Sequence, residues 1–268
     1  MSKLRGQEFF TSIGRPTFVV APMVEQSELP FRLLARRYGA QLCYTPMLHS
    51  QKMTIAPKYR ANNFHTCAED RPLIAQLAGD NKHTLLEAAK HVQDSCDAVD
   101  LNLGCPQGIA RRGHYGSFLL EEKDLLVDIV SHLDANLKVP VTCKIRLLPK
   151  LEDTLTLVRA LEAAGCSILT VHGRTKEQNK DWSGICDWDA IKAVKEVLKI
   201  PVFANGGIGS LADVRRCMEY TGVDGVMSSE AVLSNPALFV DRVHPETGKL
   251  VSQAELALEY ADIYEKHP

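Results

Sequence analysis

The sequence predicts an α/β protein, a (β/α)₈ barrel of the TIM type. Eight short apolar runs alternate with longer segments that carry apolar residues at helical spacing, which is typical of βα units and a parallel sheet. Polar or reactive residues follow most of these runs, and the carboxyl ends of barrel strands share one rim. An open doubly wound sheet is the alternative that the alternation leaves open.

The eight runs are nearly continuous in apolar residues, as expected for strands that are covered on both faces. They span residues 18–21, 42–45, 73–76, 98–102, 141–145, 168–171, 202–204 and 225–227. Six segments between them predict helices, at residues 29–38, 84–94, 123–133, 154–164, 188–198 and 211–220.

Several residues signal where these helices begin and end. Gly39 and Gly165 directly follow two of the helices, a position where glycine is common. Asp153 or Ser210 could cap the start of a helix through the side-chain oxygen.

The pattern changes after Asn235, where NPALF predicts one last short helix. A polar stretch follows, and residues 252–266 predict a further helix, with Ser252 and Glu255 spaced as a capping box. We therefore expect a catalytic barrel over residues 1–242 and the beginning of a truncated C-terminal helical region over residues 243–268.

Composition and charge restrict the possible functions. The chain has 268 residues, no run near the ~20 apolar residues of a membrane span, and no apolar signal segment at its start. Its eight cysteines are never closer than nine positions, so no C-x-x-C metal pair exists. These features predict an intracellular protein with reduced cysteines, no metal and no membrane partner. The net charge of −2 means that any RNA contact must use local basic patches.

A set of reactive residues closes the predicted strands and would converge on one rim. Its chemistry-bearing members are Pro22 with Met23, Gln76, Asn102 with Gly104 and Cys105, Lys144, His172, Asn205 with Gly206 and Gly207, and Ser228 with Ser229 and Glu230.

These residues lie in motifs that resemble the tRNA-dihydrouridine synthase family. The motifs are VAPMV at residues 20–24, DLNLGCPQGIARRGHYG at 100–116, VTCKIR at 141–146, LTVHGRT at 169–175 and FANG at 203–206. The resemblance runs from about residue 19 to residue 239, and the segment around Cys105 is similar in detail to the eukaryotic branch that acts on tRNA positions 16 and 17.

The resemblance implies FMN in the barrel mouth. Pro22, Met23 and Val24 would form a floor for the flavin ring, Gln76 would bind a ring edge, and Lys144 would place a positive charge near N1 and C2. The phosphate would lie among His172, Asn205, Gly206, Gly207, Ser229 and Glu230. Gly207 and the segment SSEA depart from the family pattern, in which a polar residue and SAEG are more usual.

The implied reaction is the reduction of uridine to 5,6-dihydrouridine in tRNA, at D-loop positions 16 and 17. NADPH would reduce FMN, the flavin would pass a hydride to C6, and Cys105 would donate a proton to C5. Asn102 would hold the flipped uracil, and Arg111, Arg112 and Arg174 would contact tRNA phosphates. Lys144 and His172 would favour a thiolate, so a Cys105 loop that moves in with substrate would suit an acid. We expect a monomer in the cytoplasm, the nucleus or both.

Two other functions fit parts of the sequence. An FMN barrel could reduce free pyrimidines, as dihydroorotate and dihydropyrimidine dehydrogenases do, although the basic loop after Cys105 suits a polymer better. A catalytically idle RNA-binding module is the second alternative. The presence of Cys105, Lys144, Gln76 and His172 together argues against it.

Overall fold

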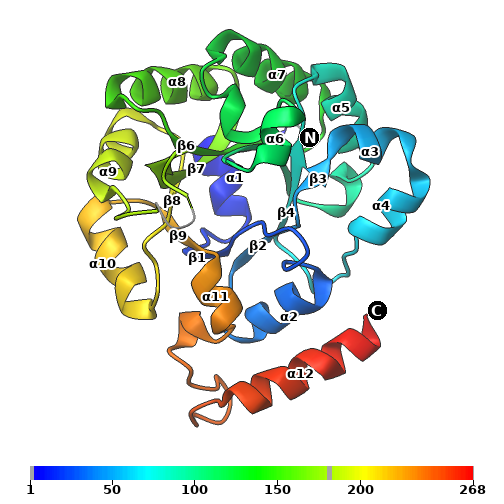
Figure 1. The fold of residues 1–268 in the computed structure, drawn as a ribbon. Helices are drawn as coiled ribbons and strands as arrows, with labels where there is room; N and C mark the ends of the chain where they lie inside the picture. The colour runs from blue at the N-terminus through cyan, green and yellow to red at the C-terminus, as the bar shows by residue number, and fades with distance from the viewer. Residues whose placement is uncertain (1–2, 180–182, 268) are drawn as a thin grey trace.

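A computed structural model describes residues 3–179 and 183–267, and it shows a closed parallel barrel (Figure 1). The barrel strands are β1 (Phe18–Val20), β2 (Leu42–Tyr44), β4 (Leu73–Ala78), β5 (Ala98–Leu103), β6 (Val141–Leu147), β7 (Cys166–Thr175), β8 (Val202–Asn205) and β9 (Gly225–Ser228). Each pairs with its neighbours in order, β2 pairs with β4, and β1 pairs with β9. These pairings confirm the (β/α)₈ barrel and exclude the open sheet.

The predicted helices form an outer ring around the strands (Figure 1). They are α2 (Leu29–Arg37), α5 (Lys82–Lys90), α7 (Lys123–Asn136), α8 (Leu151–Ala163), α9 (Trp188–Val197) and α10 (Leu211–Thr221). The predicted second helix was too long, because α5 ends at Lys90 and a separate 3₁₀ turn, η1 (Gln93–Ser95), follows.

The residues predicted to mark the ends of helices do so with one exception. Gly39 and Gly165 adopt the left-handed φ values of +92° and +108° directly after their helices, and the Ser210 side chain accepts a hydrogen bond from the backbone N–H of Asp213. Asp153 was the wrong N-cap, because α8 already begins at Leu151. Its carboxylate lies instead in the first turn, where negative charge stabilises the helix.

The sequence did not predict the short elements. They are α1 (Gly6–Ser12), β3 (Leu48–His49), α3 (Ser50–Ile55), α4 (Pro57–Asn63), α6 (Gly108–Arg112), η2 (Gly116–Leu119), α11 (Glu230–Ser234) and η4 (Leu238–Val240). Each is too short to show a clear period. The last two replace the short helix expected over NPALF, because Asn235 ends α11 and the chain resumes as η4.

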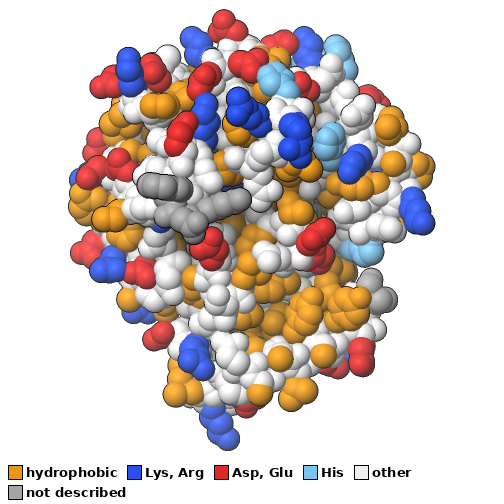
Figure 2. Space-filling model, in the orientation of Figure 1, with side chains coloured by type: hydrophobic (Ala, Val, Ile, Leu, Met, Phe, Trp, Pro, Cys, Tyr) orange, Lys and Arg blue, Asp and Glu red, His pale blue; other side chains and the backbone are white. Residues whose placement is uncertain are grey.

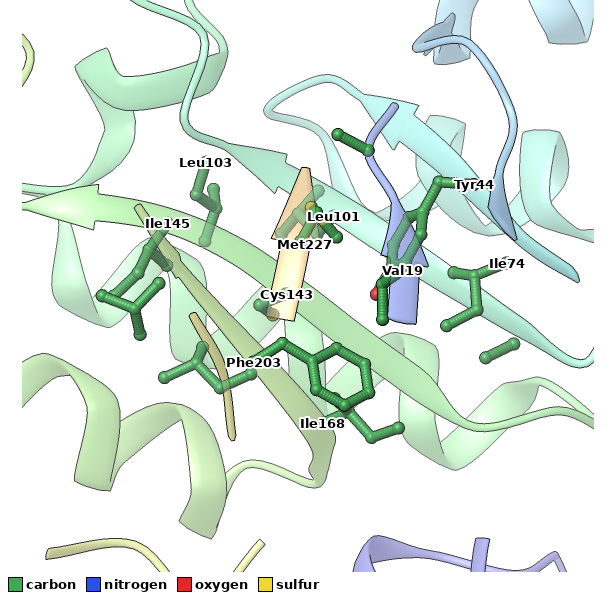
Figure 3. Close-up of a cluster of buried hydrophobic side chains, with 14 of the residues drawn as sticks. Val19, Tyr44, Ile74, Leu101, Leu103, Cys143, Ile145, Ile168, Phe203 and Met227 are labelled. Atoms are coloured by element: carbon green, nitrogen blue, oxygen red, sulfur yellow. The ribbon is translucent and has the colours of Figure 1, made fainter. Parts of the chain in front are cut away.

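Alternate residues of each strand point to opposite sides of the barrel wall. In β5, Leu101 and Leu103 pack in the main hydrophobic core, whereas the polar residues Asp100 and Asn102 lie on the other face. Figure 3 shows part of the main hydrophobic core, including Leu101, Leu103 and Phe203. The ring of Phe10 in α1 lies 6.0 Å from that of Phe203, so α1 packs against the interior of the barrel.

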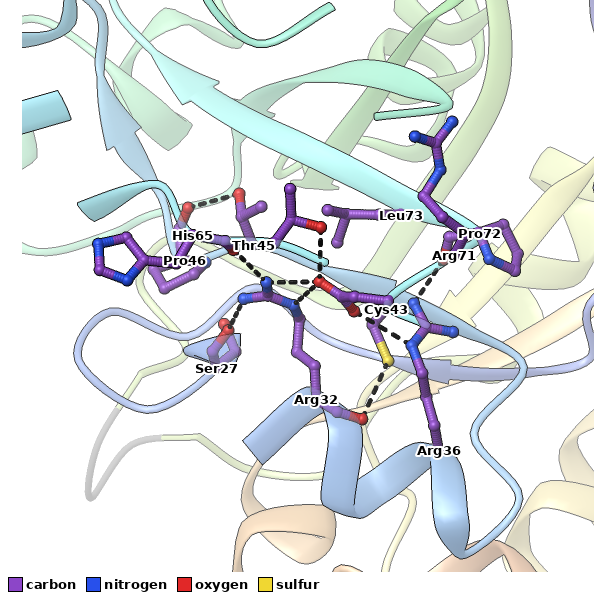
Figure 4. A network of polar contacts seen from close by, with 12 residues as sticks. Ser27, Arg32, Arg36, Cys43, Thr45, Pro46, His65, Arg71, Pro72 and Leu73 are labelled. Atoms are coloured by element: carbon purple, nitrogen blue, oxygen red, sulfur yellow. Dashed lines mark hydrogen bonds and ion pairs between the residues drawn. The ribbon is translucent and has the colours of Figure 1, made fainter. Parts of the chain in front are cut away.

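A buried ion-pair network fixes the loop between β1 and α2 (Figure 4). Arg32 and Asp70 are 1% and 0% exposed, and the guanidinium of Arg32 contacts the Asp70 carboxylate at 2.6 Å. Arg32 also donates to the carbonyl oxygens of Ser27 and His65, both at 2.7 Å. Arg36 binds the second oxygen of Asp70 at 3.1 Å.

The C-terminal helix α12 (Gln253–Lys266) begins with the predicted capping box of Ser252 and Glu255. It packs along α2 (Figure 1). Leu256 and Ile263 share a small separate core with residues of α2, and the Tyr38 hydroxyl donates to Glu259 at 2.6 Å. Among the described helices, none has the length and apolar character needed to cross a bilayer.

Replacing Arg32 with Met is expected to lower the free energy of unfolding by about 3 kcal/mol, because Asp70 loses a partner where water cannot reach it. Arg37→Met on the same helix breaks only an exposed pair with Glu259 and should cost less than about 1 kcal/mol. Urea denaturation of the two variants checks this difference. Equal losses would contradict a special role for the buried pair.

Candidate active site

The polar face of the barrel strands forms the candidate site. The strand register sets Gln76 beside Asp100, Asn102 beside Lys144, and His172 beside Asn205. Gln76, Lys144 and His172 do not end their strands as expected, because β4, β6 and β7 continue for two or three residues beyond them. The polar residues point into the barrel, and their neighbours along each strand pack outside it.

Three buried polar residues form a directed hydrogen-bond chain. Gln76 Nε2 donates to Asp100 Oδ2 at 2.8 Å, and Asn102 Nδ2 donates to Gln76 Oε1 at 2.7 Å. The Asn102 Oδ1 then accepts from the backbone N–H groups of Gly104 and Cys105, at 3.1 and 3.0 Å. Asn102, predicted to hold a substrate base, therefore also positions the Cys105 backbone.

Asp100 in this chain and Lys144 beside it have shifted pKa values. Burial raises the pKa of the Asp100 carboxyl to about 6, against the opposing effect of hydrogen bonds from Thr142 and Gln76. Burial, and then the charge of Arg146, lower the pKa of Lys144 to about 8. Lys144 makes no hydrogen bond or ion pair with any residue that the structure describes. A Cβ on Gly104 would lie 3.8 Å from its Nζ, which places the ammonium beside the Cys105 loop.

Cys105 is half-buried, and its backbone is bound on both sides. Its carbonyl oxygen accepts from the N–H and hydroxyl of Ser117, at 3.1 and 3.0 Å. Gly116 makes this approach possible, because its φ is +72° and a Cβ there would lie 2.6 Å from the Cys105 oxygen. These contacts hold the backbone of Cys105 in one position within the loop.

Arg146 ties the Cys105 loop to the loop after β7. It is 8% exposed, and its Nε donates to the carbonyl of Gly104 at 2.9 Å, while Nη1 donates to the carbonyls of Thr175 and Gln178. Arg146 is the last residue of the motif VTCKIR, but the sequence predicted no role for it. Its spacing of two from Lys144 was the available signal, because both side chains then share a strand face.

His114 closes the other end of the Cys105 loop. Its Nδ1 contacts Asp80 and its Nε2 contacts Glu122, both at 2.7 Å, although the residue has a left-handed φ of +50°. Hydrogen bonds to Asp80 and then to Glu122 raise the pKa of His114. A protonated ring can donate to both carboxylates at once, so the contacts of His114 with Asp80 and Glu122 are strongest when His114 is charged.

The predicted phosphate-binding residues line one cavity of about 450 Å³. His172, Asn205, Gly206, Gly207, Ser229 and Glu230 all border it, together with Arg174. Arg174 was predicted to contact tRNA, but its guanidinium binds the Gly184 carbonyl and the His172 ring and faces this cavity. A larger cavity of about 710 Å³ beside it shares Gly207 but is lined mainly by the loops after β6 and β7.

His172 is a neutral group in this cavity. Burial, followed by the charges of Lys144, Arg146 and Arg174, lowers its pKa to about 2. Because Arg174 Nη1 can only donate, the His172 Nε2 at 3.2 Å accepts and Nδ1 carries the proton. A neutral His172 therefore adds no positive charge to the site.

The glycine turn after β8 borders the cavity and brings its backbone close against the His172 and Cys186 side chains. Gly206 and Gly207 have φ values of +98° and +73°, and a Cβ on Gly206 would lie 2.7 Å from the His172 ring. The hydroxyl of Ser228, which borders the cavity, is buried without a hydrogen-bond partner among the described residues. Asn205 Nδ2 donates to the Met227 carbonyl at 2.9 Å. Glu230 can offer an anion only its backbone N–H, because its carboxylate would repel one.

The remaining predicted residues lie around the rim. Met23 is buried and Val24 is 56% exposed in the loop that follows β1 and Pro22. Arg111 and Arg112 end the short helix α6, and Arg111 borders a separate cavity of about 360 Å³ with Lys176 and Phe118. Figure 2 shows Lys and Arg side chains over the region of α6 and a hydrophobic area between the barrel centre and α2.

The cysteines and the acids that the structure describes are not grouped as metal ligands. All eight cysteines are free. Within residues 3–179 and 183–267, no group of three or more His, Cys, Asp or Glu side chains is arranged to hold a metal ion.

The family model for dihydrouridine synthase (Dus) matches residues 19–268. The chain belongs to the dihydrouridine synthase family. Relatives within this family include the tRNA-dihydrouridine(16/17) synthase [NAD(P)(+)]-like protein of Mus musculus, 53% identical over 100% of this chain and 56% of that protein. The Saccharomyces cerevisiae tRNA-dihydrouridine(16/17) synthase [NAD(P)(+)] is 47% identical over 94% of this chain and 63% of that protein.

This chain of the dihydrouridine synthase family aligns with only part of each of these relatives. The chain spans about three fifths of the length of the mouse, rat and yeast relatives. A human tRNA-dihydrouridine(20a/20b) synthase [NAD(P)+]-like protein is 37% identical over 96% of this chain and 81% of that protein. Among solved structures, a 2-naphthoyl-CoA reductase superposes with a TM-score of 0.64 at 10% identity, over 84% of this chain and 49% of that one. This likeness supports the fold alone.

Gly116→Ala is expected to destabilise the chain by about 1–3 kcal/mol, because φ is left-handed and the new methyl meets the Cys105 backbone. It should also change the rate at which iodoacetamide alkylates Cys105. Gly108→Ala in the same loop has no atom within 4 Å of the new Cβ and serves as the matched control. Thermal denaturation and peptide mass mapping of the alkylated thiols measure both effects. Equal behaviour of the two variants would contradict the packing described for Gly116.

Lys144→Met is expected to stabilise the flavin-free chain at pH 7 by about 2 kcal/mol, because folding buries a charge there. The pKa of Lys144 falls from about 10.5 in the unfolded chain to about 8 in the fold. The cost of the charge is therefore complete below pH 8 and disappears as the pH rises towards 10.5. Urea denaturation between pH 7 and pH 10 measures the gain, which should shrink with rising pH. A gain that is constant or grows over that range is the contrary result.

Proposed function

We propose that this chain reduces uridine to 5,6-dihydrouridine in tRNA, with Cys105 as the acid that protonates C5. The observation that carries the proposal is the placement of Cys105. Its backbone is bound by Asn102 and Ser117, and Lys144 lies beside the same loop. The names of the relatives, which are 47–53% identical, support the same reaction at positions 16 and 17.

FMN is the proposed cofactor, and the residues at the mouth suit it. The backbone of Gly206 and Gly207 borders the cavity and would offer N–H groups to a phosphate, and Arg174 supplies positive charge there. Pro22, Met23 and Val24 would lie under the flavin ring. When bound, FMN supplies the hydride that is added at C6 of the uracil, and NADPH is the proposed reductant, in keeping with the NAD(P)(+) in the names of the relatives.

The side chains of the barrel then have separate tasks. Lys144 holds positive charge where negative charge develops on a reduced ring, and it does so below its pKa of about 8. Gln76, which is fully buried, keeps one N–H and one lone pair beyond its bonds to Asp100 and Asn102. The second N–H of Asn102 is free to bind a uracil oxygen. Cys105 keeps its thiol proton until the base is in place and passes it to C5.

The proposed partner is tRNA, bound through local basic groups. Arg111 and Arg112 lie on α6, directly after Cys105, and are exposed. Residues 243–268 would belong to a helical region that adds tRNA contacts, and α12 exposes Leu258 and Tyr264 beyond its own small core. One barrel supplies every residue of the proposed site, which suits a monomer. A tRNA substrate and free cysteines fit the cytoplasm, the nucleus or both.

Cys105→Ala is expected to reduce dihydrouridine formation on unmodified tRNA at least about 100-fold, because general acid catalysis contributes on that order. FMN binding should be unchanged. Cys67→Ala is the matched control, because Cys67 is the other cysteine that is not fully buried and lies outside the site. Mass spectrometry of the tRNA product measures both. Full activity in Cys105→Ala would refute the assigned role.

Free uridine and uracil serve as competing substrates in the same assay. Faster turnover of the free pyrimidines than of tRNA would favour the small-molecule reductase. tRNA binding without any turnover or bound flavin would favour the RNA-binding module.

A further inference from the structure

Asp100 is a buried carboxylate that touches neither the candidate cavity nor Cys105. It is 0% exposed, and its two oxygens accept hydrogen bonds from Thr142 at 2.6 Å and from Gln76 at 2.8 Å. Burying a charge of this kind is costly. A neutral hydrogen-bonding side chain of similar shape would avoid this cost, so the carboxylate calls for a specific reason.

The reason lies in the direction of the hydrogen-bond chain. Side-chain amides can turn over, because their oxygen and nitrogen ends are similar in shape. An ionised carboxylate can only accept. Asp100 therefore forces Gln76 to present Nε2 towards it and Oε1 towards Asn102. That oxygen in turn fixes Nδ2 of Asn102 towards Gln76.

The end of the chain is the backbone of Cys105. With Nδ2 committed to Gln76, the Asn102 Oδ1 faces the N–H groups of Gly104 and Cys105, and both donate to it. If the amides were reversed, Nδ2 of Asn102 would face these two N–H groups, and donors would oppose donors. The loop would then lose its two anchoring hydrogen bonds.

We propose that Asp100 is a positioning residue: as the acceptor-only end of the Asp100–Gln76–Asn102 chain, it sets the direction of both amides and so holds the Gly104–Cys105 backbone in place. This inference rests on the proposed function only for its catalytic consequence. The hydrogen-bond polarity itself is a property of the chain without substrate.

Hydrogen exchange of the Gly104 and Cys105 amides tests the proposal directly. Asp100→Asn keeps the shape but can donate as well as accept, so it no longer dictates the direction. Exchange at these two amides should become at least about fivefold faster, which corresponds to about 1 kcal/mol of lost hydrogen bonding. Exchange in α7 serves as the internal reference for global stability. Thr142→Val removes the other hydrogen bond to Asp100 and leaves the chain to Cys105 intact. Measured at pH 8, well above the Asp100 pKa of about 6, it should not change exchange at Gly104 and Cys105.

A double substitution separates positioning from a general effect of disturbing the core. In Asp100→Asn with Gln76→Glu, the acceptor-only group moves one step along the chain. The carboxylate introduced at position 76 would accept from the amide introduced at position 100 and also from Asn102, which restores the original direction of Asn102. We expect slow exchange at Gly104 and Cys105 to return, and also folding if the single variant fails to fold.

Two results would overturn the proposal. One is unchanged exchange at Gly104 and Cys105 in folded Asp100→Asn. The other is a double variant in which the two amides stay as exposed as in the single variant, or which does not fold. Because exchange is measured without tRNA or NADPH, it can succeed even if uridine reduction is not the activity. If uridine is reduced, Asp100→Asn should also lower kcat on tRNA more than it raises KM, since the loop carries the acid.

Discussion

The closed parallel barrel is the constraint on which the rest of this structure depends. Its wall sends alternate side chains outward to the helices and inward to the barrel axis. The same strands can therefore build the hydrophobic core and the polar site, as Leu101 and Asn102 do in adjacent positions of β5. Closure through the β1–β9 and β2–β4 pairs brings Gln76, Lys144 and His172 to one mouth, although they lie far apart in the chain.

The carboxyl-end mouth of the barrel carries a cluster of positive side chains and a loop that holds Cys105 through several hydrogen bonds. Lys144, Arg146 and Arg174 concentrate positive charge in a protein whose net charge is −2. Arg146 and His114 bind the segment around Cys105 to neighbouring loops through backbone and carboxylate groups. The thiol is therefore placed by many weak contacts, most of which involve backbone atoms rather than the sulfur. Such a loop can change with substrate only by breaking several of these bonds together.

The sequence was sufficient to predict the barrel, its eight strands and the six long helices, because burial on both faces and helical periodicity leave clear patterns. It also grouped six residues at a phosphate site, and the structure places all six around one cavity: His172, Asn205, Gly206, Gly207, Ser229 and Glu230. Short helices such as α6 left no periodic signal. Asp100, Arg146 and His114 were not predicted as site residues, because their roles arise from contacts with atoms distant in the sequence. The available signals were the spacing of two between Asp100 and Asn102 and between Lys144 and Arg146, which places each pair on one strand face. No such spacing pointed to His114.

We propose that this mouth holds a flavin, and the visible absorbance spectrum of the purified chain is the decisive measurement. A chain that binds flavin shows a flavin spectrum, and FMN is released into solution when the protein is denatured. A colourless protein that takes up no FMN on reconstitution would contradict the claim and leave the barrel as an RNA-binding module.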